Sequence, residues 1–194
     1  LVVHQGLPSS IYDASCDGTW LLMEDIYEQR SWDSANTNKL ESSTIHSYLN
    51  GDFQDLFDSN IKDAIKQVKI PYRKNGGSGG TTQQGANGLS VKIFLLSGYE
   101  VGFTTSDSSY FPVDGAKLDY FTASSGGNVK RIANFNGSPY GWWLRSLYGG
   151  NALSVWYVDS SGSRNRLSSY TSYGVRPAII LPNDMLVTDD MLAA

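Results

Sequence analysis

The chain has 194 residues and a mass of 21.2 kDa, which fits a single domain, and its 40% hydrophobic content excludes global disorder. A net charge of −4 and a pI near 5.0 exclude the basic surface that nucleic-acid binding requires. The apolar runs are far shorter than the roughly 20 residues of a membrane-spanning helix, so no membrane insertion is expected.

Residues 1–12 are predicted to form an extended N-terminal arm, followed by one domain over residues 13–182. Residues 19–27 mix apolar and acidic side chains in a way that suits a strand, and Gly18 before them is a turn signal. Cys16 is the only cysteine, so it has no disulfide partner, and no zinc-ligand spacing surrounds it. We therefore expect a buried structural thiol.

Helical periodicity predicts two helices in the first half of the chain. The first begins after Ser42 or Ser43, because either side chain can accept a hydrogen bond from the free amides of a first turn, and it ends near Gly51. The second begins at one of residues 58–60 and ends at Pro71. Its apolar positions recur at offsets of three and four: Ile61, Ala64, Ile65 and Val68.

Residues 75–88 are rich in glycine, which invites comparison with a phosphate-binding loop. Such a loop needs Gly-Lys-Ser or Gly-Lys-Thr at the start of a helix, and neither tripeptide occurs. A flexible loop is therefore predicted for this segment.

Strands dominate the rest of the predicted structure. Alternation over residues 89–97 predicts a strand that buries Val91, Ile93 and Leu95. Shorter strands are expected at residues 132–135, 142–144, 153–158 and 175–181, before a tail over residues 183–194. Early helices and late strands indicate the α+β class, with two helices on one side of a mostly antiparallel sheet formed largely by the C-terminal half.

No catalytic or metal-binding residues are predicted. Glu24 and Asp25 are neighbours on a predicted strand and therefore point to opposite faces, so they do not form an acid–base pair. His4 and His46 lie beside no nucleophile or second metal ligand in the sequence.

Five segments in consistent order resemble a bacterial and phage-associated group with the C-type lectin fold. They are residues 19–22, 43–53, 92–97, 142–146 and 174–178. The resemblance implies this fold for residues 13–182. Many members of the group are variable proteins of diversity-generating retroelements, in which mutation at adenines in a C-terminal region alters the choice of ligand. Residues 142–177 correspond to that region.

The resemblance also limits the chemistry. The chain has neither the Glu-Pro-Asn or Gln-Pro-Asp loop nor the Trp-Asn-Asp motif of calcium-dependent lectins. Formylglycine-generating enzymes share the fold but use cysteines in their C-terminal half, whereas the one cysteine here is Cys16. We expect a non-catalytic ligand-binding protein with no cofactor. A metal-independent carbohydrate-binding module and a divergent enzyme on this fold are the alternatives.

The residue types between Lys130 and Met185 fit two explanations. Lys, Glu, Gln and Met are absent there, although all four occur earlier in the chain. Adenine-directed mutation of Asn codons that end in a pyrimidine cannot produce these residues, so diversification would explain their absence. A sheet region rich in Tyr, Ser and Gly also has little need of helix-favouring residues, which explains it equally well.

Residues 142–177 contain both the predicted anchors and the predicted ligand-binding residues. Their content of Tyr, Trp, Ser, Gly and Asn is typical of surfaces that combine rigid contact area with adaptable hydrogen bonding. The predicted structural anchors are Trp142, Trp143, Arg145 and Arg176, with carboxylates or carbonyls as partners of the arginines. The predicted ligand-binding residues are Tyr148, Asn151, Trp156, Tyr157, Arg164, Asn165, Arg166, Tyr170 and Tyr173.

The expected partner is a protein or cell-surface ligand, a glycan among the options. No secretory signal is visible in the sequence. A virion or cell-surface location is favoured.

Overall fold

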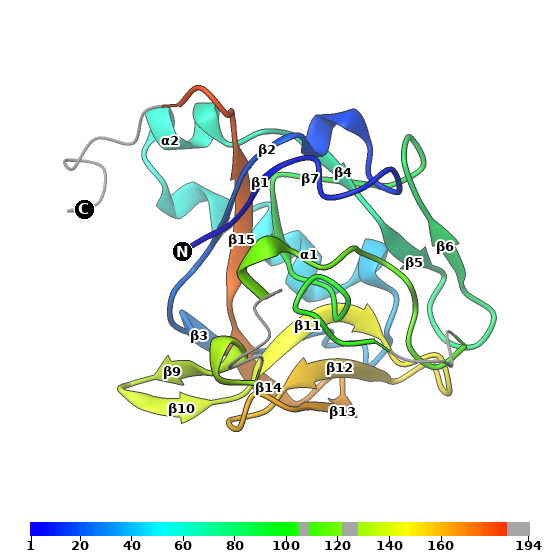
Figure 1. Ribbon diagram of the computed structural model, residues 1–194. Coiled ribbons are helices and arrows are strands. Elements are labelled where there is room, and N and C mark those ends of the chain that lie inside the picture. The colour runs from blue at the N-terminus through cyan, green and yellow to red at the C-terminus, as the bar shows by residue number, and fades with distance from the viewer. Residues whose placement is uncertain (105–108, 122–127, 186–194) are drawn as a thin grey trace.

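A computed structural model describes residues 1–104, 109–121 and 128–185, and its strands form two main sheets (Figure 1). The first sheet has four strands in the order β1 (Val2–Gly6), β2 (Gly18–Leu22), β15 (Pro177–Leu181) and β8 (Ile93–Leu95). β2 and β15 pair antiparallel at its centre. Strands from opposite ends of the sequence are thus neighbours.

The second main sheet has five strands. They are, in order, β13 (Arg164–Ser168), β12 (Ser154–Val158), β11 (Trp142–Leu147), β14 (Ser172–Val175) and β3 (Glu28–Ser31). β11 and β14 run parallel, and the other neighbours in this sheet are antiparallel. β14 and β15 are separated only by Arg176, so the chain passes directly from one main sheet to the other (Figure 1).

Three two-stranded sheets complete the strand structure. They pair β4 (Val68–Ile70) with β7 (Leu89–Val91), β5 (Tyr72–Lys74) with β6 (Thr81–Gln83), and β9 (Ala133–Phe135) with β10 (Ser138–Tyr140). In the β9–β10 hairpin, Asn136 and Gly137 both have positive φ, which suits the tight turn that these residue types predict. The antiparallel α+β class is confirmed. The four-stranded sheet, however, comes mainly from the N-terminal half, contrary to expectation.

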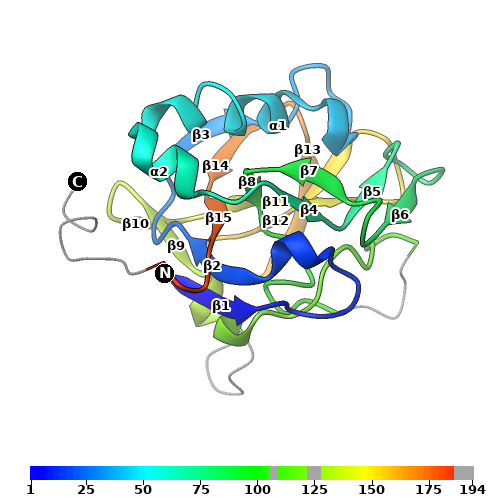
Figure 2. The ribbon, with the colours of Figure 1, turned by 90° about the horizontal axis from the view of Figure 1, so that it is seen from above.

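Both predicted helices are present. α1 (Thr44–Leu49) begins after Ser43, whose Oγ accepts a hydrogen bond from the His46 amide at 3.2 Å. α2 (Ser59–Ala64) is much shorter than predicted, because Val68 continues into β4 and pairs with Val91. Short 3-10 helices lie at Ala14–Cys16, Leu40–Ser42, Gln54–Leu56, Asp119–Phe121 and Val129–Arg131. Seen from above, α1 and α2 lie along one side of the molecule and β1 along the opposite side (Figure 2).

Several predictions for the loops and ends were wrong. Residues 1–12 are extended but belong to the domain, because β1 pairs with β2 and the Tyr12 side chain is buried. Within residues 75–88, Thr81–Gln83 form β6, and the other residues are the turns and loops that connect β6 to β5 and β7. The predicted strand at 19–27 ends at Leu22. Of the predicted tail, residues 186–194 lie outside the described residues.

The core consists of two clusters on opposite faces of the five-stranded sheet. Trp142 and Trp143 are consecutive residues of β11, so they point in opposite directions, and each is 0% exposed. Trp142 packs with Trp20 from β2, whereas Trp143 packs with Ile45 from α1. In the described ranges no helix is long and apolar enough to cross a membrane.

Candidate functional site

The hairpin of β12 and β13 divides the predicted ligand-binding residues between two faces. Trp156 is paired with Arg166, and these residues share one face with Arg164. Tyr157 is paired with Asn165, and both belong to the other face. The nine predicted residues therefore do not form one continuous surface, because neighbouring residues of a strand point in opposite directions.

One face carries an aromatic–arginine patch, which we define as Tyr110, Tyr148, Trp156, Arg164 and Arg166. The ring of Tyr148 contacts a second aromatic ring and a guanidinium group. The Tyr110 ring stacks with it at a centroid distance of 5.6 Å and an interplanar angle of 16°. The Arg166 guanidinium carbon lies 4.2 Å from the Tyr148 centroid, within the range of a cation–π contact. Trp156 meets Tyr148 edge-on at 5.5 Å.

Arg164 extends the patch. Its guanidinium carbon lies 4.9 Å from the centroid of Phe111 and 5.5 Å from that of Trp156. Its Nη1 donates a hydrogen bond to the carbonyl of Thr104 at 3.1 Å. The aromatic rings thus support both arginine stems, while both residues remain exposed.

The backbone around Tyr110 is fixed by hydrogen bonds. Its carbonyl accepts from the Gly149 amide at 3.0 Å and from the Trp156 indole at 3.1 Å. Arg73 donates from Nη1 to the carbonyl of Ser109 at 3.0 Å. The contact with Gly149 is so close that a Cβ there would lie 1.7 Å from the Ser109 oxygen. Only glycine at this position lets the segment that carries Tyr110 reach β11.

On the opposite face, Tyr157 and Tyr173 are packing residues. Their rings lie 4.7 Å apart, and the Tyr173 ring also contacts that of Trp143 at 5.6 Å. A Cβ at Gly141 would lie 2.2 Å from the Tyr173 hydroxyl, so this ring covers the backbone there. Burial raises the pKa of Tyr173, and the neighbouring Tyr157 raises it further. We therefore assign both tyrosines to the edge of the second core cluster.

Of the remaining predicted residues, two accept hydrogen bonds from nearby backbone amides, and one is exposed to solvent. Asn151 accepts hydrogen bonds through Oδ1 from the amides of Leu153 and Ser154, both at 2.8 Å, and so shapes the turn before β12. The Asn165 side chain accepts from the Arg166 amide at 2.8 Å. Tyr170 is 61% exposed.

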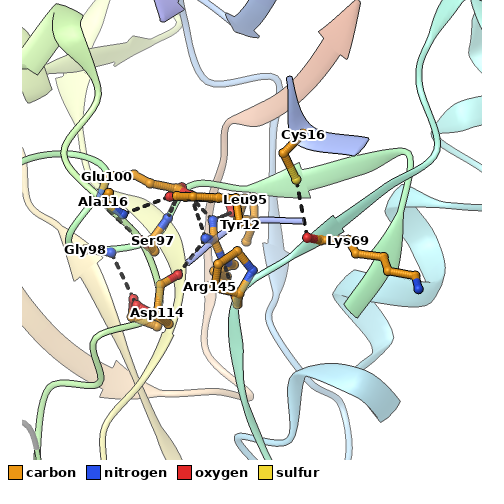
Figure 3. Close-up of polar contacts among 12 residues, drawn as sticks. Tyr12, Cys16, Lys69, Leu95, Ser97, Gly98, Glu100, Asp114, Ala116 and Arg145 are labelled. Atoms are coloured by element: carbon orange, nitrogen blue, oxygen red, sulfur yellow. Dashed lines mark hydrogen bonds and ion pairs between the residues drawn. The ribbon is translucent and has the colours of Figure 1, made fainter. Parts of the chain in front are cut away.

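A buried polar network joins Arg145 to the acidic residues Glu100 and Asp114 (Figure 3). Arg145 from β11 donates to the two carboxylate oxygens of Glu100 at 2.5 and 2.6 Å, and the two side chains are 1% and 0% exposed. Glu100 also accepts from the Tyr12 hydroxyl and from the Ser97 amide, each at 2.8 Å. Arg145 therefore has the buried carboxylate partner that its position as an anchor predicts.

Asp114 connects this network to the segment that bears Tyr110. Its carbonyl accepts from Arg145 at 2.7 Å, and its carboxyl group accepts from the Ser146 hydroxyl at 2.9 Å. Burial raises the Asp114 pKa to about 7, against a partly opposing effect of Arg145. The Ala116 amide donates to the Tyr12 hydroxyl at 2.8 Å. Residues 114–116 are thus fixed by groups that do not reach the surface.

The other predicted anchors are equally buried. Arg176 donates to the carbonyls of Met23 and Glu24, each at 2.9 Å, and burial lowers its pKa to about 10. The Cys16 thiol is 0% exposed and donates to the Lys69 carbonyl at 3.3 Å (Figure 3). Burial raises the Cys16 pKa to about 11, which disfavours the reactive thiolate. Nowhere in the described ranges do three or more His, Cys, Asp or Glu residues gather as metal ligands.

Sequence reasoning missed four residues that form the patch or the buried network: Tyr110, Phe111, Glu100 and Asp114. Tyr110 and Phe111 come from an irregular segment without periodicity, and their contact with β12 depends on long-range folding. Glu100 and Asp114 are single acidic residues whose burial no local pattern reveals. The one signal of burial in the sequence was that Glu100 lies between the apolar residues Tyr99 and Val101.

A comparison with protein families finds a model that matches residues 17–183 and is described as "Domain of unknown function (DUF6273)". The match covers nearly all of the two main sheets and leaves out β1. Neither the curated proteins nor the solved structures contain a match.

Proposed function

Because the chain belongs to the DUF6273 family, whose description names no activity, we propose a function from the geometry of the site. The protein is a non-catalytic ligand-binding protein, and its aromatic–arginine patch recognises a protein or cell-surface ligand. The observation that carries this proposal is the stack of Tyr110, Tyr148 and Arg166, in which Tyr110 and Arg166 are exposed.

Preorganisation supports this proposal. Binding normally costs about 0.5–1.5 kcal/mol for each flexible side chain that becomes ordered. The Arg166 guanidinium already contacts the Tyr148 ring, and the backbone of Tyr110 is fixed through its carbonyl. Tyr, Trp and Arg are also the residue types that contribute most to binding energy at interfaces. A surface of this kind loses little entropy when a ligand binds.

The experiment uses fluorescently labelled protein and intact cells of a panel of bacterial strains, with flow cytometry as the readout. We expect binding to at least one strain, and at least a tenfold loss with Tyr148→Ala or Arg166→Ala. Arg30→Ala is the matched control, because Arg30 also stacks on a tyrosine, Tyr48, but at a distance from the patch and beside Glu28. Equal binding by all three variants would contradict the proposal.

We extend the proposal to the C-type lectin fold and to a variable protein of a diversity-generating retroelement. The difference in burial supports this extension: Arg145, Glu100 and Asp114 are buried and stabilise the fold from within, whereas Tyr110, Arg164 and Arg166 of the patch are exposed. Changes at Tyr148, Arg164 or Arg166 are therefore compatible with an intact core.

Sequencing the surrounding locus tests this extension. We expect a near-duplicate of the codons for residues 148–173 that differs mainly at adenines, close to a reverse-transcriptase gene. Substituted codons should fall at patch positions and spare those for Trp142 and Arg145, whose side chains are buried. A locus without any such duplicate would exclude diversification. The cell assay would then still test the binding function independently.

A further inference from the structure

The two arginines of the patch have a defined spacing. Arg164 and Arg166 are two residues apart on β13, and both lie on the face that carries Trp156. Residues at this separation on a strand lie about 6.8 Å apart along the strand axis. β13 is the outermost strand of the five-stranded sheet, so both exposed side chains stand at an accessible border of the molecule.

The charge of these arginines is not neutralised within the described part of the chain. No acidic side chain in that part forms an ion pair with either residue, and the Arg166 guanidinium makes no hydrogen bond there. Arg164 uses one nitrogen to bind the Thr104 carbonyl. A planar guanidinium with open donors binds carboxylates through two parallel hydrogen bonds. On a protein of net charge −4, the patch is a local site for an anionic group.

Arg30 shows the contrast. Its guanidinium carbon lies 3.6 Å from the centroid of Tyr48, a stack similar to that of Arg166 on Tyr148. Its Nε, however, already donates to the Glu28 carboxylate at 3.1 Å. Among the residues that the structure describes, the arginine–tyrosine stack at Arg30 has an internal acid and the one at Arg166 lacks it.

The backbone edge of β13 is less suited to binding a ligand, by pairing with an added strand, than its side chains are. The Arg166 amide donates to the Asn165 side chain at 2.8 Å, which occupies a donor that an added strand would need. A ligand at this border is therefore recognised through the arginines and the aromatic rings more than through sheet pairing.

We infer that the ligand of the patch is an extended acidic peptide segment with Asp or Glu at alternate residues, an inference that rests on the proposed binding function. In an extended peptide, alternate side chains lie on the same side and start about 6.8 Å apart, which matches the backbone spacing of Arg164 and Arg166 on β13. Tyr110 is 48% exposed beside the stack and offers its ring to an apolar side chain of the same segment.

The test uses fluorescence anisotropy with a labelled ten-residue peptide in which Glu alternates with Thr. Three further probes are a peptide with the same composition but contiguous Glu residues, an alternating peptide with Gln in place of Glu, and an oligogalacturonate. We expect the alternating Glu peptide to bind at least tenfold more tightly than each of the other three. Arg164→Ala and Arg166→Ala should each weaken its binding fivefold or more, whereas Arg30→Ala should leave it unchanged.

The outcomes that contradict the inference are distinct. Equal affinity for the alternating and contiguous peptides would remove the argument from spacing. Tighter binding of the oligogalacturonate would show that the anionic ligand is a glycan. If no anionic probe binds but Tyr148→Ala still abolishes cell binding, the inferred ligand class is wrong while the proposed function stands. If the patch variants retain both cell binding and peptide binding, the inferred ligand class and the proposed function are both wrong.

Discussion

Replacing Glu100 by Gln is expected to lower the free energy of unfolding by about 3–5 kcal/mol, the effect of leaving one member of a buried ion pair without its partner. The Arg145 guanidinium would keep its contacts with the carbonyls of Leu95, Pro71 and Asp114, but it would lose its carboxylate partner. The amide nitrogen of Gln would also face a donor on Arg145 or Tyr12, because all the present neighbours of this carboxylate donate to it.

Urea denaturation of the wild type, the Glu100→Gln variant, the Arg145→Met variant and the double variant measures this effect. The double variant should lose less stability than the sum of the two single variants, because removing both charges leaves neither unpaired. Lys62→Met is a control, since Lys62 forms an ion pair with an aspartate, Asp55, whose side chain is 76% exposed. Additive effects at Glu100 and Arg145 would contradict a coupled buried pair.

Replacing Asp114 by Asn is expected to flatten the dependence of stability on pH. Asp114 is buried, and its carboxyl group accepts a hydrogen bond from the Ser146 hydroxyl; burial raises its pKa from 3.8 to about 7, although the nearby charge of Arg145 opposes this shift. Between these two values the native state retains a proton that the unfolded state releases. The contribution of Asp114 is therefore fully present below pH 3.8 and is lost as the pH rises toward 7.

The size of this effect follows from the shift. A difference of this size between the native and unfolded pKa corresponds to roughly 4 kcal/mol across the interval. Denaturation from pH 4 to 8 should show the wild type losing stability relative to Asp114→Asn as the pH rises. Asp55→Asn, at an exposed aspartate, serves as the control and should run parallel to the wild type. Parallel curves for Asp114→Asn would show that this carboxyl group is ionised throughout.

Local signals in the sequence predicted local structure well. Ser42 or Ser43 was predicted as the cap because a capping serine acts within its own turn, and the structure shows that Ser43 makes this bond. Val68 was assigned to a helix because its spacing from Ile61 and Ile65 is helical. It forms a strand instead because Val91, from a distant segment, pairs with it. Apolar spacing alone could not distinguish these outcomes.

The site was predictable in part for similar reasons. Arg145 was recognised as an anchor from its setting between apolar residues, but its partner Glu100 required the tertiary structure. The polar composition of residues 164–168 concealed strand β13, and with it the alternation that separates Arg164 and Arg166 from Asn165. Composition indicated which residue types could bind a ligand. Only the strand geometry shows which of them share a face.

The pairing of β2 with β15 also has a consequence for the kinetics of folding. Leu22 pairs with Ala178, so the central contact of the four-stranded sheet joins segments separated by most of the chain. Closing so long a loop is slow, and domains dominated by such contacts fold in milliseconds to seconds. During synthesis, β2 and β8 emerge from the ribosome well before the strand that lies between them. The nascent chain must therefore keep the edges of β2 and β8 unpaired until β15 has been synthesised, and unpaired sheet edges promote aggregation.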